Sequence, residues 1–152
     1  MRSLVLASCL VVSGCSLFMH SIERPTATVR NASISSAGFT GISGELQLDV
    51  MNPNNFGVPI SGIDWQLSVG GSRAATGTVQ LSQTIPARGV APITTSLTIT
   101  ASDAIAIASV IASGARNYQI NAQLHFSTTV GQLDVAIQHA GTIDGGSLLG
   151  LR

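Results

Sequence analysis

Residues 42–50 read Ile-Ser-Gly-Glu-Leu-Gln-Leu-Asp-Val, and this stretch alternates between apolar or small and polar side chains. Side chains in a β-strand point alternately to the two faces of a sheet, so Ile42, Leu46 and Val50 share one face. The stretch therefore predicts a strand with one buried and one solvated face. It ends at Asn52-Pro53-Asn54, where a proline that cannot donate to a ladder and two turn-forming asparagines predict a turn.

The same alternation recurs along the chain between turn signals. It predicts further strands over 26–35, 63–69, 73–78, 93–99, 118–126 and 133–137, with 79–85 as an irregular continuation of 73–78. About seven short strands separated by turns are typical of an antiparallel β-sandwich or barrel. The pattern therefore predicts a mainly β fold.

One segment, residues 101–113, breaks the period of two. Ile107 and Ile111 lie four positions apart, as they do on one side of a helix. The segment predicts a single helix that is capped at Ala101 or Ser102. We expect this helix either to plug one end of the sandwich or to form a lid over an apolar groove.

The N-terminus carries a separate signal. Arg2 is followed by an apolar stretch over 4–12, which is too short to span a membrane and is typical of a secretory signal. Its end, Val12-Ser13-Gly14-Cys15, resembles a bacterial lipoprotein signal, which implies cleavage before Cys15 and attachment of lipid to its sulfur. The alternative is an ordinary signal peptide that is cut elsewhere. Since Ser16 follows the cysteine, we expect an outer membrane facing the periplasm in a bacterium with two membranes.

This signal divides the chain into four parts. Residues 1–14 are the expected lipoprotein signal peptide, 15–24 a lipid-anchored tether, 25–143 the sandwich domain and 144–152 a C-terminal tail. Charged residues make up only 9% of the chain and the formal net charge is zero, which predicts no nucleic-acid partner. Both cysteines lie within the first fifteen residues, so we expect no disulfide in the domain.

The segment 46–60, Leu-Gln-Leu-Asp-Val-Met-Asn-Pro-Asn-Asn-Phe-Gly-Val-Pro-Ile, resembles the late-embryogenesis-abundant type 2 family, also called the water-stress and hypersensitive-response (WHy) domain. The resemblance extends to 63–71, to Gly77 and to 85–89, Ile-Pro-Ala-Arg-Gly. It implies an immunoglobulin- or fibronectin-III-like sandwich over about 25–143. It also implies a stress-associated protein without enzymatic activity, catalytic residues or cofactor.

The chemistry-bearing side chains suggest no reaction. His20, His125 and His139 fit no metal-binding spacing, and we expect them to be surface histidines. The aspartates are expected to be solvated charges, and the strands place Asp49, Asp64 and Asp134 on solvent faces. Two further sites have alternatives. Asn52 and Asn54 form either a recognition loop or, as we expect, a structural turn. The inward-facing Trp65 is either a ligand platform or, as we expect, a core anchor.

These observations leave three functional hypotheses for a non-enzymatic, lipid-anchored envelope protein. The first is protection against desiccation and other stress, with client proteins as partners. The second is a periplasmic carrier of an apolar ligand such as a lipid. The third is a subunit of an envelope assembly. In each of them the membrane is a partner through the anchor at Cys15.

Overall fold

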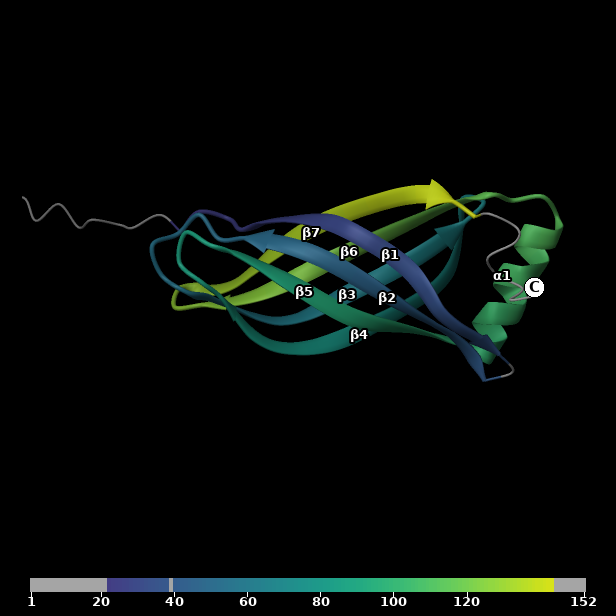
Figure 1. Cartoon of the computed structure of the whole chain (residues 1–152), viewed down its shortest axis with the longest axis horizontal. Helices are drawn as coiled ribbons and strands as arrows, with labels where there is room; N and C mark the ends of the chain where they lie inside the picture. The colour runs from purple at the N-terminus through teal and green to yellow at the C-terminus, as the bar shows by residue number, and fades with distance from the viewer. Residues whose placement is uncertain (1–21, 39, 144–152) are drawn as a thin grey trace, which may run out of the picture.

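The chain folds into two antiparallel sheets that pack face to face (Figure 1). A computed structural model describes residues 22–38 and 40–143. Its elements in chain order are β1 (Thr26–Gly38), β2 (Gly41–Met51), β3 (Val58–Val69), β4 (Ser72–Ile85), β5 (Val90–Thr100), α1 (Ala101–Ala112), β6 (Asn117–Thr128) and β7 (Gly131–Thr142). The predicted sandwich of seven strands and one helix is confirmed. The expected signal peptide and C-terminal tail lie outside the described residues.

One sheet has the strand order β1-β2-β5 and the other has the order β4-β3-β6-β7. The alternation that predicted β2 is realised in its second half, where Leu46, Leu48 and Val50 are at most 1% exposed. They face Ile63 of β3 and Phe126 of β6, which belong to the same buried cluster. The core is therefore a layer of aliphatic side chains between the inner faces of two sheets.

β4 is longer than the strand that the sequence pattern predicts over 73–78. It is one continuous strand, and its pairing with β3 shifts register between Ile60 and Gly62. Ile60 pairs with Gln83 and Gly62 pairs with Gln80, so two residues of β4 stand opposite one residue of β3. The segment 79–85 looks irregular because Gln83 is polar and exposed, although it falls in the same alternation as Val79, Leu81 and Ile85.

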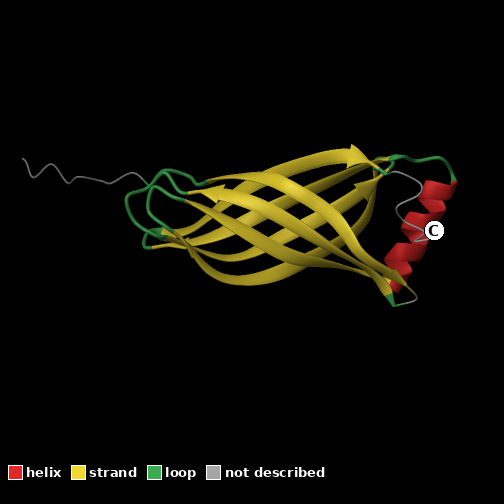
Figure 2. Cartoon of the chain, in the orientation of Figure 1, coloured by secondary structure: helices red, strands yellow, loops and turns green. Residues whose placement is uncertain are grey.

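The helix α1 lies across one end of the sandwich (Figure 2). We call this the helix end. The opposite end, which we call the tether end, holds the described N-terminus and the turns β2–β3, β4–β5 and β6–β7 (Figure 1). The prediction of a cap at Ala101 or Ser102 is wrong, because the N-cap is Thr100, the last residue of β5. Its side chain accepts a hydrogen bond from the Asp103 backbone N–H.

Candidate functional site

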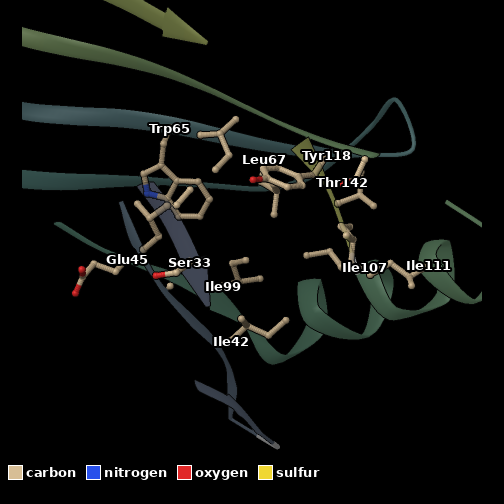
Figure 3. A pocket seen from close by; sticks show the side chains of 16 residues that line it. Ser33, Ile42, Glu45, Trp65, Leu67, Ile99, Ile107, Ile111, Tyr118 and Thr142 are labelled. Carbon is tan, nitrogen blue, oxygen red and sulfur yellow. The ribbon is translucent and has the colours of Figure 1, made fainter. Parts of the chain in front are cut away.

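The sandwich contains an apolar cavity of about 350 Å³ between its two sheets at the helix end. Figure 3 shows Trp65 on one side of this cavity and Ile107 and Ile111 of α1 on the other. The remaining walls are mostly aliphatic side chains from both sheets, among them Ile42, Leu67, Val69, Leu97, Ile99 and Ile120. The cavity thus continues the hydrophobic core up to the helix, and it is partly open to solvent.

The helix forms one wall of the cavity for a local reason. Ile107 is buried, and Ile111 follows one turn later on the same side. The cap at Thr100 fixes the start of α1, and Ser113 ends it by donating its backbone N–H to the Ser109 carbonyl. Of the two predicted roles, the lid over an apolar groove describes this arrangement better than the plug, since a cavity remains beneath the helix.

Only a few polar side chains line the cavity. Ser33 and Thr142 line it from β1 and β7, which are the neighbouring edge strands of the two sheets. Tyr118 also lines it, and its hydroxyl lies 3.3 Å from Nε2 of His139. The Glu45 carboxylate points away from the other labelled side chains (Figure 3). Such a site suits an apolar ligand whose polar part stays near the β1–β7 edge.

Asn52 forms the centre of the tether end. It is fully buried, and its side-chain Nδ2 donates to the carbonyls of Phe56, Ile85 and Pro86 at 2.7–3.2 Å. Its Oδ1 accepts from the backbone N–H and the side chain of Asn54, both at 3.0 Å. One amide thereby joins the β2–β3 loop to the β4–β5 turn and leaves no atom for a ligand. Pro53, between the two asparagines, is half-buried.

Asn54 connects this centre to the N-terminal segment. Its Oδ1 accepts from the Glu23 backbone N–H at 2.9 Å, and its Nδ2 donates to the Glu23 carbonyl at 2.8 Å. These two hydrogen bonds satisfy both backbone groups of Glu23, as a neighbouring β-strand would. The end of the expected 15–24 tether is therefore bonded to the domain. Cys15 lies outside the described residues.

A polar cluster lies on the outer face of the four-stranded sheet. His125 of β6 places Nδ1 2.8 Å from Asp134 of β7 and Nε2 3.0 Å from Asp64 of β3. Asp64 in turn accepts from Thr78 of β4 at 2.6 Å. The bonds from Asp134 and Asp64 raise the pKa of His125, because both carboxylates favour the charged ring. The bond from Thr78 and then the bond from His125 lower the pKa of Asp64.

Asp64 and Asp134 have side chains that are 53% and 44% exposed, on the solvent face where the sequence pattern placed them, but His125 joins them into one cluster. The His125 side chain is only 18% exposed and bridges three strands. Sequence reasoning placed each residue on the correct face but did not include the register that brings together positions 61 apart. Asp49 likewise forms an ion pair with Arg30 of β1.

Neither a metal site nor a membrane span is found in the part of the chain that the structure describes. No three His, Cys, Asp or Glu side chains there form a group that could hold a metal ion. No helix among the same residues is long and apolar enough to cross a bilayer. Trp65 is 4% exposed within the core cluster, as predicted, and also contributes to the cavity wall.

A comparison with protein families matches the segment that carries these features. A sequence profile named LEA_2, described as late embryogenesis abundant protein, matches residues 47–141. The chain belongs to the LEA_2 family. The match runs from β2 to β7, so it includes the Asn52 centre, α1 and the His125 cluster. A search of curated proteins finds no match to this LEA_2 chain.

Solved structures share the LEA_2 fold at low sequence identity. A crystal structure from Archaeoglobus fulgidus has a TM-score of 0.62 and 14% identity, over 81% of this chain and 96% of that chain. A solution structure from Arabidopsis thaliana has a TM-score of 0.64 and 16% identity, over 81% of this chain and 83% of that chain. The solution structure of a candidate late embryogenesis abundant protein has a TM-score of 0.60 and 23% identity, over 80% of this chain and 71% of that chain. At these identities the likeness establishes the fold alone.

Proposed function

We propose that this LEA_2 protein binds an apolar ligand, such as a lipid acyl chain, in the cavity beneath α1. The cavity itself carries the proposal. Ligand sites are typically apolar hollows of roughly 300–1,000 Å³ with a few polar groups that orient the ligand. Here about 350 Å³ is lined mainly by aliphatic side chains, with Ser33, Tyr118 and Thr142 among the few polar lining residues. The proposal assigns the protein no reaction.

Binding of a fluorescent fatty acid to the chain from Ser16 to Arg152 tests this function. The blocking variant is Ala32→Phe, since Ala32 lines the cavity from β1. The matched control is Ala140→Phe, at an exposed position of β7, the other edge strand. We expect the wild type and the control to bind the probe equally, and the blocking variant to bind at least about tenfold more weakly. Failure of the wild type to bind, or equal binding by the blocking variant, would refute the proposal.

We further propose that Cys15 is acylated and holds the protein in the cell envelope, on the periplasmic face of the outer membrane in a bacterium with two membranes. The sequence Val12-Ser13-Gly14-Cys15 supports this. Several acyl chains give a stable anchor because each buried CH₂ contributes about 0.8 kcal/mol. Growth with an alkyne-labelled palmitate should label the wild type and leave a Cys15→Ala variant unlabelled. Labelling of both forms would contradict acylation at Cys15.

Stress protection is the second candidate function, in keeping with the family description. The specific observation is the uncharged polar outer surface, where exposed positions carry hydroxyl or amide groups, as at Thr76, Thr78 and Gln80 of β4 and Thr94 and Ser96 of β5. Such groups hydrate a surface without strong charge. A dried or freeze-thawed client enzyme should keep more activity with this protein than with an equal mass of an inert protein. Equal recovery would exclude protection in solution.

A further inference from the structure

The tether end presents a group of exposed apolar side chains. Met51, Phe56, Val90 and Val130 are 47%, 37%, 56% and 78% exposed, and we call them the apolar rim. They belong to the β2–β3, β4–β5 and β6–β7 connections or to the strand ends beside them. Within the described residues, the remaining large exposed hydrophobic side chain is Ile105, on α1 at the other end.

Backbone bonds hold together the β2–β3 and β4–β5 connections, which carry Met51, Phe56 and Val90 of the apolar rim. Met51 of β2 pairs directly with Val90 of β5. The next residue, Asn52, donates its N–H to the Gly89 carbonyl at 2.9 Å, and Arg88 donates to the Asn54 carbonyl at 2.8 Å. Single exposed hydrophobic residues need no explanation, but a fixed group of them marks a binding surface. Turns are otherwise places for polar residues.

The position of the chain start indicates which partner this surface meets. Glu23 is bonded to Asn54 within the same loop that carries Phe56. Cys15 precedes Ile22 by seven positions, which can span at most about 25 Å at about 3.5 Å per residue. A lipid on Cys15 therefore keeps the tether end close to the bilayer. Exposed Arg24 and Arg88 add cationic groups at this end, beside the acidic Glu23.

We propose that the apolar rim docks on the membrane that holds the anchor. Its four side chains enter the interfacial layer of the bilayer, and Arg24 and Arg88 lie at the level of the lipid phosphates. The protein then stands upright, with α1 and the cavity directed away from the membrane. This inference rests on the proposed acylation of Cys15, and it adds a second, non-covalent contact between the domain and the lipid.

Quenching by brominated lipid tests the orientation. The acylated full-length protein is placed in vesicles of phosphatidylglycerol and phosphatidylethanolamine with brominated acyl chains. Two probe variants, Val130→Trp and Val90→Trp, report from separate connections at the tether end. Ile105→Trp is the matched control, since Ile105 is 72% exposed at the helix end. The native Trp65 is 4% exposed and provides the common background.

We expect the emission of each probe variant to fall at least about twofold in brominated vesicles, and that of Ile105→Trp to stay unchanged. If the protein sediments with the vesicles but neither probe is quenched, the docking is refuted while the anchor remains. Equal quenching at Ile105 would refute the upright orientation. Absence of sedimentation would refute both the anchor and the docking.

Discussion

At the scale of single residues, the buried Asn52 side chain joins two connections of the tether end. Replacing it with alanine removes five hydrogen bonds and leaves the buried Ile85 carbonyl and the Asn54 N–H without that partner. We expect Asn52→Ala to lower the free energy of unfolding by about 3 kcal/mol. Asn55→Ala, at an exposed position of the same loop, should change it by less than about 0.5 kcal/mol. Urea unfolding followed by Trp65 fluorescence measures both values, and equal effects would contradict the role of Asn52.

Gly77 is required by the indole that lies against it. Gly77 pairs with Trp65 across β3 and β4, and a Cβ there would lie 2.6 Å from the ring. Gly77→Ala should cost about 1–3 kcal/mol, because the ring must move within a packed core. The control is Gly38→Ala, where a Cβ would meet nothing within 4 Å. Thermal unfolding compares the two variants, and an unchanged melting temperature for Gly77→Ala would disprove the close contact.

At the scale of elements, the β5–α1 junction depends on one side chain. Thr100 ends the strand and caps the helix, and its hydroxyl also donates to the Asp103 carboxylate. Thr100→Ala should lower the free energy of unfolding by about 1 kcal/mol. Ser109→Ala, within the same helix, should have an effect below about 0.5 kcal/mol, because the Ser109 hydroxyl bonds the Ala106 carbonyl one turn back in its own helix. Amide exchange in α1 should accelerate in the first variant alone, and equal rates would count against the cap.

Local sequence patterns predicted most of the strands and the helix. They missed features that depend on a partner strand or on the backbone geometry at a junction. The alternation over 42–50 and the spacing of Ile107 and Ile111 were sufficient, since each is a property of one element. The bulge in β4 was not visible, because it is defined by the partner strand. The cap was misassigned because Thr100 satisfies the strand pattern as well, and only the backbone geometry reveals its second role.

At the scale of the whole molecule, the His125 cluster makes stability depend on pH. The pKa of His125 is raised above its ordinary value of 6.5. The stability that the charged ring contributes is therefore fully present below pH 6.5 and is lost as the pH rises through the raised pKa. The pKa values of Asp64 and Asp134 are lowered from the ordinary value of 3.8. The stability that these two carboxylates contribute is therefore present above pH 3.8 and is lost as the pH falls through the lowered values. The cluster therefore stabilises the fold most between about pH 4 and 6.5.

Unfolding at about pH 5.5 and about pH 8.5 measures the histidine part of this effect. The wild type should lose more stability on the rise in pH than His125→Gln does, because glutamine has no charge to lose. His139→Gln is the matched control, because His139 contacts Tyr118 and lies outside the His125 cluster. An identical pH dependence in the wild type and His125→Gln would show that the bridge contributes nothing.

The candidate sites are properties of the assembled sandwich, and this limits what the sequence reveals. The cavity draws its walls from every strand except β4 and from α1, so no single segment contains its signal. The apolar helix and the high aliphatic content did indicate an apolar groove. The exposure of Val130 could not be inferred, because an apolar residue in a short segment is equally compatible with burial.

The placement of the tether and the cavity at opposite ends determines which lipid pool the protein could serve. Strands of 11–14 residues rise about 3.3 Å per residue, so the sandwich separates its two ends by about 40 Å. In the proposed arrangement, an acyl chain beneath α1 would lie beyond the reach of the leaflet that carries the anchor. Loading and release would take place across the aqueous gap, with a soluble donor or an opposing membrane. The domain would hold its ligand at the helix end, away from the membrane to which the tether end is anchored.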